Sequence, residues 1–253
     1  MFGWLRPRRA ARVIPQPLWL EVLARYPFIS AAPQEELARL RVLAGEFLAT
    51  KQFHGANGFV ITDAVALAIA VQAVLPVLHL GLQWYDDFVG IVVHRDEVLA
   101  RRTIQDDAGV VHHYQEELAG EAMDGGPVML NWHDIEHAGD TAERGYNVVI
   151  HEFIHKMDMR DGAPDGCPPQ PSRTARQAWL AVVQGQYEAF REKVIIAERF
   201  GGNAPWLDSY GAQAIDEFFA VACEGYFVNP PRFADEFPAL VPLFDGFFKP
   251  NPA

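Results

Sequence analysis

The sequence contains little cysteine and comparatively little basic charge, and each shortage excludes a class of protein. Its two cysteines, Cys167 and Cys223, lie far apart and form no Cys-x-x-Cys pair, which argues against a disulfide scaffold and a thiolate zinc site. The 33 acidic residues outnumber the 21 basic ones and give a formal charge of -12, which disfavours nucleic acid and anionic membranes as partners. We therefore expect a protein of the reducing cytoplasm that binds neither.

The sequence also lacks a hydrophobic segment long enough to cross a membrane. Its longest apolar run covers residues 64–75, contains Gln72 and stops at Pro76, well short of the roughly 18 residues that a span requires. A buried helix is expected there instead. The arginines near the start of the chain are followed by prolines and charged residues and not by an apolar export region. We therefore interpret residues 1–15 as a basic tail.

Half of the 253 residues are hydrophobic, so the chain can bury a substantial core, and we expect one domain over residues 16–253. Apolar spacing predicts helices before and after a stretch of short β-type runs. The predicted helices cover residues 16–26, 33–48, 64–75, 147–158, 174–193 and 212–227, and the predicted strands cover 88–93 and 128–132. The expected fold is α+β and mainly helical, with a small mixed sheet, a helical part at 16–85 and a catalytic part at 86–253.

The predicted helix at 147–158 contains the pattern His151-Glu152-x-x-His155. Side chains four residues apart share one helix face at about 5–6 Å, so both imidazoles can reach one ion at about 2.0–2.1 Å. Glu152 cannot easily join them as a ligand, but it can reach a water beside the ion, which suits a general base. Because apolar residues fill the rest of this helix, unpaired histidines would be costly to bury there, and a metal offsets that cost. The alternative is a pair of ordinary core or surface histidines.

A second pattern, His133-x-x-Glu136-His137, has the inverted order of another metallopeptidase arrangement. It follows directly on a predicted strand, ends near Gly139 and lacks the apolar turns of a long buried helix. We interpret it as a polar loop or short helical turn near the rim of the active-site cleft. It is the less favoured of the two metal sites.

A catalytic zinc needs three protein ligands and an open position, so one ligand must come from elsewhere in the chain. The predicted helix at 212–227 bears Glu217 and Glu224, seven residues apart and therefore on roughly one face. Spacing alone leaves the choice between them open, and Asp216 suits an exposed position. Asp158, one turn beyond His155, either orients a histidine or is a helix-end carboxylate without that role.

The residues around the first motif, Gly145-Tyr-Asn-Val-Val-Ile-His-Glu-Phe-Ile-His-Lys-Met-Asp-Met-Arg-Asp-Gly162, resemble the signature of the Mlc titration factor A family. Similar stretches occur in the same order at the opening Met-Phe-Gly-Trp-Leu, at residues 75–85 and at residues 208–221. The resemblance covers most of the chain, and residues 145–162 and 208–221 are its most specific parts.

The resemblance implies a zinc-dependent peptidase of aminopeptidase type that is related in fold to the lethal-factor toxin metalloprotease and is therefore zincin-like. His151 and His155 match the zinc histidines, Glu152 the catalytic base, and Glu217 the third, gluzincin-like ligand. Tyr210 matches an active-site tyrosine of the toxin relative, unless it only packs by its ring. A peptide is then the expected substrate and Zn²⁺ the expected cofactor.

The resemblance also implies a protein partner, because members of the family bind the glucose-responsive repressor Mlc and relieve repression of sugar-uptake genes. No motif in this sequence matches a repressor-contacting surface. Two hypotheses follow. The chain is a zinc peptidase that also titrates an Mlc-like repressor, or it is a metal-containing regulator-binding protein whose hydrolysis is weak or incidental.

Overall fold

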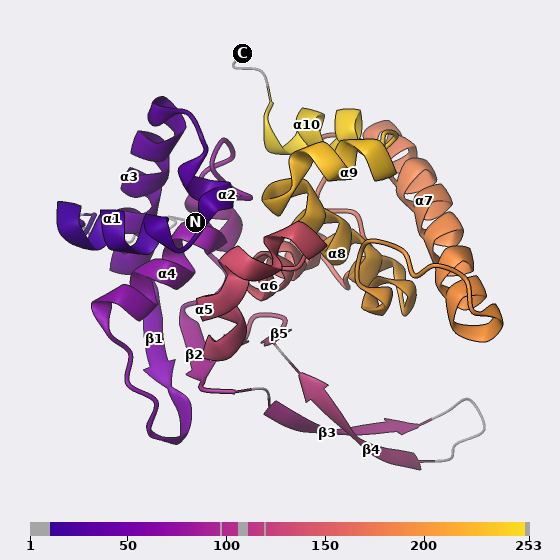
Figure 1. Cartoon of the computed structure of the whole chain (residues 1–253), viewed down its shortest axis with the longest axis horizontal. Helices are drawn as coiled ribbons and strands as arrows, with labels where there is room; N and C mark the ends of the chain where they lie inside the picture. The colour runs from indigo at the N-terminus through magenta and orange to yellow at the C-terminus, as the bar shows by residue number, and fades with distance from the viewer. Residues whose placement is uncertain (1–10, 97, 106–110, 119, 251–253) are drawn as a thin grey trace, which may run out of the picture.

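In the computed structural model, the backbone is described for residues 11–96, 98–105, 111–118 and 120–250, and the side chains for 11–96 and 120–250. Helices make up most of the structure and lie above a small sheet in the view of Figure 1, which confirms the expected mainly helical α+β class. Residues 1–10 of the predicted basic tail lie outside the described part, and residues 11–15 form no helix or strand. Within the described ranges, no helix has the length and apolar character needed to span a bilayer.

The main sheet has four strands in the order β1, β2, β6, β5. Strands β1 (Gln52–Gly55), β2 (Gly90–His94) and β6 (Val128–Asn131) run parallel, and β5 (Gly120–Ala122) pairs antiparallel with β6 at one edge. The predicted strands at 88–93 and 128–132 correspond to β2 and β6. Strands β3 (Val98–Gln105) and β4 (Val111–Leu118) form a separate antiparallel pair, which projects below the other elements in Figure 1.

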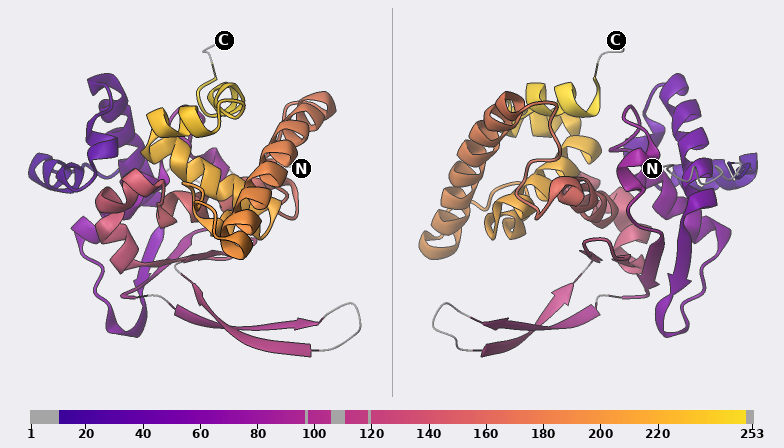
Figure 2. Two further views of the ribbon diagram at one scale, coloured as in Figure 1. Left: turned by 45° about the vertical axis from the view of Figure 1, so that its right-hand side comes forward. Right: turned by 180° about the vertical axis from the view of Figure 1, so that it is seen from behind.

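The amino-terminal helices lie beside the sheet, at the end of the molecule opposite the long helix α7 (Arg173–Phe200) (Figure 2). They are α1 (Gln16–Ala24), α2 (Pro27–Ser30), α3 (Gln34–Thr50) and α4 (Asp63–Ala73), with short 3-10 turns η1 (Ala56–Gly58) and η2 (Leu82–Tyr85). Helix α4 is the buried helix expected from the apolar run, because its residues 67–73 are all buried. The Thr62 hydroxyl caps it by accepting a hydrogen bond from the Val65 amide at 3.2 Å.

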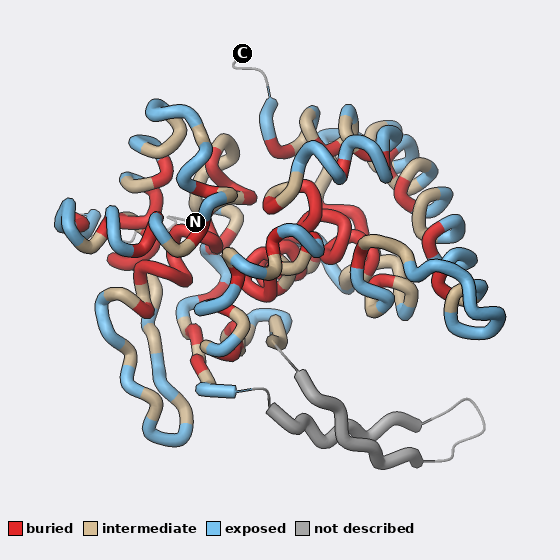
Figure 3. The backbone as a smooth tube through the Cα atoms, viewed as in Figure 1, coloured by how far each residue is buried: buried red, intermediate tan, exposed pale blue. Residues whose placement is uncertain are grey.

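Two central helices, α6 (Val148–Asp158) and α8 (Ile215–Val228), carry most of the residues predicted for the site. Helix α6 packs against α8, against β5 and β6 of the sheet, and against α4 from the amino-terminal part. Figure 3 shows that buried residues are concentrated along these central helices. The polar side chains of α6 are therefore held on a helix that is fixed from several sides.

The carboxy-terminal part is more helical than the sequence indicates. Helix α7 continues past the predicted end at residue 193, and the tail rich in proline and phenylalanine forms α9 (Pro230–Glu236) and α10 (Val241–Phe248). Pro230 stands in the first turn of α9, where the missing amide hydrogen is tolerated. Buried phenylalanines four residues apart stabilise this part of the chain by ring contacts, stacked between Phe233 and Phe237 and edge to face between Phe244 and Phe248.

Candidate metal centre

Helix α6 is anchored by Asn147, the residue before its first turn. The side-chain oxygen of Asn147 accepts a hydrogen bond from the Ile150 amide at 2.9 Å, and its side-chain amide donates to Gln72 Oε1 of α4 at 2.7 Å. The backbone amide of Asn147 donates to the carboxylate of Glu224 on α8. One residue thus caps α6 and ties its start to two neighbouring helices.

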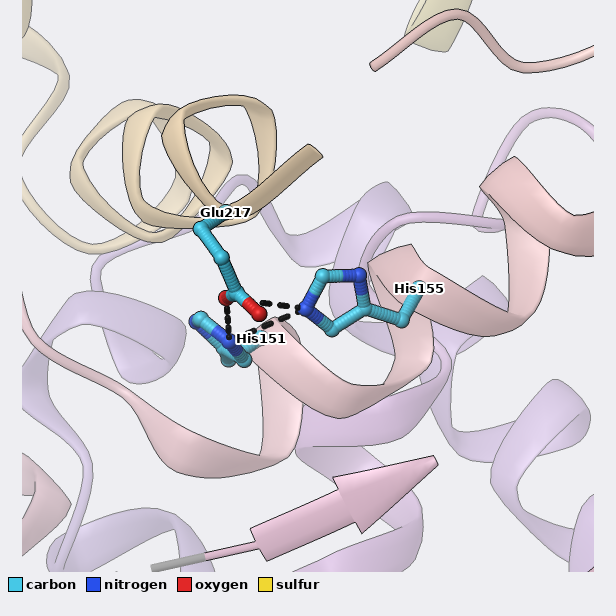
Figure 4. Close-up of side chains that lie close together, drawn as sticks. All are labelled: His151, His155 and Glu217. Atoms are coloured by element: carbon cyan, nitrogen blue, oxygen red, sulfur yellow. Dashed lines mark hydrogen bonds and ion pairs between the residues drawn. The ribbon is translucent and has the colours of Figure 1, made fainter. Parts of the chain in front are cut away.

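His151 and His155 of α6 and Glu217 of α8 point toward one another (Figure 4). The two histidine Nε2 atoms are 3.1 Å apart, and they lie 3.1 and 3.2 Å from Glu217 Oε2. Two ligands that each lie about 2.0–2.1 Å from one tetrahedral ion are expected to be roughly 3.3 Å apart. Over the side chains that the structure describes, this is the one group of three donors close enough together to hold a metal ion.

The two carboxylates of α8 face different nitrogens. Glu217 faces the Nε2 atoms, whereas Glu224 Oε1 lies 2.8 Å from Nδ1 of His151. A carboxylate only accepts hydrogen bonds, so Glu224 holds a proton on Nδ1 of His151. When His151 is protonated, its Nε2 also donates to Glu217, and when His151 is neutral, the Nε2 lone pair is free to bind a cation. The geometry therefore favours Glu217 as the third ligand and Glu224 as the group that orients His151.

The charges of this cluster stabilise one another. Burial opposes ionisation of Glu217, but hydrogen bonds from His151 and His155 outweigh it and lower the pKa of Glu217 below its usual range. Burial also opposes protonation of His151, but bonds to Glu217 and Glu224 outweigh it and raise the pKa of His151 well above its ordinary value. The cluster therefore attracts positive charge, and its two imidazoles and one carboxylate fit a divalent cation.

Glu152 lies beside the cluster and is not one of its three donors. The residue is only 5% exposed, and this burial raises the pKa of its carboxyl group from 4.5 to about 7. A carboxyl group that titrates near neutral pH can both take up and release a proton under physiological conditions. Glu152 is therefore chemically suited to proton transfer next to the cluster.

A cleft of about 620 Å³ opens beside these residues and is lined in part by His151, Glu152 and Tyr210. Tyr210 belongs to the 3-10 turn η5 (Ser209–Ala212), which Asp208 caps by accepting a hydrogen bond from the Tyr210 amide at 2.9 Å. The Tyr210 hydroxyl lies 3.4 Å from Glu217 Oε1. The ring of Tyr210 also lies near His151. Both its hydroxyl group and its ring therefore approach the cluster.

Comparison with known proteins identifies the family. The profile of the glucose-regulated metallo-peptidase M90 family matches residues 2–249. The chain belongs to this family.

Mlc titration factor A of Serratia proteamaculans (strain 568) is 33% identical to this M90 chain over 235 residues, which are 92% of the chain and 87% of the relative. The protein of that name from Edwardsiella ictaluri (strain 93-146) is 34% identical over 235 residues, with the same two shares. The Escherichia fergusonii protein of that name is 34% identical over 237 residues, which are 93% and 87% of the two chains. The family expected from the sequence is confirmed.

The second histidine pattern of the M90 chain lies on helix α5 (Trp132–Thr141), which is longer than the loop or short turn expected. The Asn131 side chain caps this helix by accepting a hydrogen bond from the Asp134 amide at 2.7 Å, which explains why the helix forms. His133 and His137 are exposed, and Nδ1 of His137 donates to the His133 carbonyl at 2.7 Å. Among the described side chains, no third donor completes a metal site with this pair.

Asp158 ends α6, just before the turn η4 (Met159–Asp161), and organises the loop beyond it. Its carboxylate accepts hydrogen bonds from the amides of Gly166 at 2.8 Å and Cys167 at 2.9 Å. Burial raises the pKa of Asp158 to about 6. These hydrogen bonds go to the loop and not to a histidine, which favours the second of the two roles considered from the sequence.

Sequence reasoning missed two residues that shape the site. Asn147 carries a signal that could have revealed its role, because an asparagine directly before an apolar helix is a typical N-cap. Gly120 of β5 carries none, since its importance lies in the lack of room for a side chain beside Glu152, which arises only in the folded chain.

Proposed function

We propose that this M90 chain is a zinc-dependent peptidase in which His151, His155 and Glu217 hold the metal. The observation that carries the proposal is the convergence of these three donors beside the buried carboxyl group of Glu152. Membership of a metallopeptidase family supports the reaction class. Three protein ligands with one open position are typical of catalytic zinc, and the core would then be zincin-like.

The bound metal would polarise the peptide carbonyl and make water more acidic. Glu152 takes the proton of the attacking water on its carboxylate and passes it to the leaving amine. Its pKa of about 7, which results from burial, allows both transfers near neutral pH. The Tyr210 hydroxyl donates a hydrogen bond to the oxygen on which negative charge develops. Glu224 meanwhile holds His151 in the tautomer whose Nε2 can bind a cation.

We further propose cleavage of the aminopeptidase type. The residues that line the cleft include Asp134 and Asp208 as well as Arg144. With Glu152 included, acidic groups predominate, which favours the ammonium group of a free peptide amino terminus. A peptide with a free amino terminus should be hydrolysed and its N-acetylated counterpart should not. Equal cleavage of both would refute this specificity.

Replacing Glu152 by Gln tests the enzymatic proposal. We expect the purified variant to retain zinc by elemental analysis and to lose peptide hydrolysis, whereas His151→Ala should lose the metal. His133→Ala is the matched control, and it should keep both metal and activity. Undiminished hydrolysis by Glu152→Gln would refute the role of the base, and metal loss in His133→Ala but not in His151→Ala would move the site to α5.

The name that the relatives share, Mlc titration factor A, favours a second candidate function. In this alternative, the chain is a metal-containing protein that binds an Mlc-like repressor in the cytoplasm, and its hydrolysis is weak or incidental. A pull-down from native cytoplasm compares the wild type with Glu152→Gln. Equal recovery of a repressor by both would support binding that is independent of hydrolysis, and recovery by neither would refute it.

A further inference from the structure

Strand β5 approaches helix α6 more closely than a side chain at residue 120 would allow. A Cβ atom built on Gly120 would lie 2.5 Å from Oε1, 2.6 Å from Cγ and 2.8 Å from Cδ of Glu152. Carbon atoms in favourable contact are about 3.5–4.0 Å apart. Any residue other than glycine at this position must therefore displace either the strand or the glutamate side chain.

The strand has little freedom to move away. Gly120 is paired with Leu130 of β6, and the turn that joins β5 to β6 is tied to α6 by Lys156. The Lys156 ammonium donates to the carbonyls of Met123 at 2.7 Å and Gly126 at 3.4 Å, and the residue is fully buried. Because Lys156 lies one helical turn beyond Glu152, the two side chains face the same hairpin, and Lys156 holds that hairpin beside Glu152.

Helix α6 thus divides its polar side chains between two neighbours. His151 and His155 are directed to α8, where Glu217 meets them, whereas Glu152 and Lys156 are directed to the β5–β6 hairpin. Glu152 is nearly enclosed, and Gly120 also lines the cleft. The Glu152 carboxyl group therefore fills the space that a side chain at residue 120 would take, and both residues border the cleft.

We propose that Gly120 is a positioning residue, whose lack of a side chain holds the Glu152 carboxylate in place for proton transfer. This inference rests on the proposed role of Glu152 as the base. A methyl group at residue 120 would have to push the carboxyl group by about 1 Å to reach normal contact, and a misplacement of that size lowers an enzymatic rate by about 10²-fold.

Gly120→Ala tests the proposal directly. We expect kcat for a chromogenic peptide to fall by about 10²-fold, with KM and zinc content unchanged, and a crystal structure of the variant to show the Glu152 carboxyl group displaced. Gly185→Ala in α7 is the matched control, because a Cβ atom there meets nothing within 4 Å. A kcat equal to that of the wild type, or a carboxyl group that has not moved, would overturn the proposal.

A double-mutant cycle on thermal stability tests the contact without any activity measurement. Gly120→Ala should lower Tm in the otherwise wild-type chain and much less in a Glu152→Ala background, where the opposing atoms are gone. If Gly120→Ala alone does not fold, restoration of folding by Glu152→Ala supports the same contact. An equal loss of stability in both backgrounds would overturn it. A wild type that hydrolyses no peptide would instead refute the peptidase proposal, whatever the cycle shows.

Discussion

Replacing Glu224 by Gln should weaken metal binding although Glu224 is not a proposed ligand. The carboxylate of Glu224 accepts two hydrogen bonds, one from Nδ1 of His151 at 2.8 Å and one from the backbone amide of Asn147. Glutamine offers one accepting oxygen and one donating amide. In either orientation, the amide of the new side chain therefore faces a hydrogen-bond donor, which is either His151 Nδ1 or the Asn147 backbone amide. Because residue 224 is only 1% exposed, no bulk water can accept a hydrogen bond in place of the lost carboxylate oxygen.

The size of the effect follows from the lost hydrogen bond. If the amide faces His151, the imidazole proton moves to Nε2 and blocks the lone pair needed by the metal. Loss of such an orienting partner typically weakens metal affinity by about 10–100-fold, which corresponds to about 1.4–2.8 kcal/mol. If the amide faces the Asn147 backbone instead, the free energy of unfolding should fall by about 1–3 kcal/mol, because a buried donor loses its partner.

Competition with a fluorescent zinc chelator and urea unfolding of the metal-free protein measure the two outcomes. Asp216→Asn is the matched control, since Asp216 lies on the same helix but is not one of the three donors of the cluster. We expect the control to match the wild type in both assays. A Glu224→Gln variant that binds zinc as tightly as the wild type and unfolds at the same urea concentration would refute the reasoning.

Two further predictions concern the cleft side of the site. Burial raises the pKa of Glu152 from 4.5 to about 7, so this carboxyl group stabilises the metal-free fold below pH 4.5 and that stability is lost as pH rises through 7. Metal-free Glu152→Gln should therefore be more stable than the wild type at about pH 8, by up to roughly 3 kcal/mol, and similar to it at about pH 4. Urea unfolding at both pH values measures this difference. A gain in stability that does not depend on pH would contradict the prediction. Tyr210→Phe should retain zinc and KM but lower kcat by about 10²-fold, as expected for a lost donor to a developing oxyanion. Steady-state kinetics decide this, and an unchanged kcat would leave Tyr210 with a packing role only.

The features that could be predicted from the sequence are those that depend on local spacing. The motif helix at 147–158 and the buried helix at 64–75 match α6 and α4 because apolar periodicity and capping residues act within one helix. The tail helices α9 and α10 were missed for the opposite reason. Helices of 7 and 8 residues are too short to be stable alone, and these form because their phenylalanines pack into the core.

The choice between Glu217 and Glu224 shows where spacing stops being informative. The two residues lie about 10.5 Å apart along one face of α8, and only the packing of α6 decides which of them meets the Nε2 atoms. Glu217 stands in the first turn of α8, where the helix dipole favours negative charge, and hydrogen bonds from both histidines lower its pKa despite burial. Glu224 lies deep in the core, where burial raises its pKa although His151 and Asn147 contact it.

The same residue type therefore serves two purposes because its surroundings differ. A carboxylate whose charge is strongly favoured can bind a cation, and a carboxylate enclosed by two hydrogen-bond partners can hold an imidazole in one tautomer. Both roles depend on the position of α6 along α8, which Asn147 fixes through its bonds to Gln72 and Glu224. Asn147→Ala removes the N-cap of α6 and the bond to Gln72 but keeps the backbone bond to Glu224, and we expect it to reduce metal affinity with every proposed ligand intact. Wild-type zinc affinity in that variant would show that the backbone bond to Glu224 holds α6 against α8 without the side chain of Asn147.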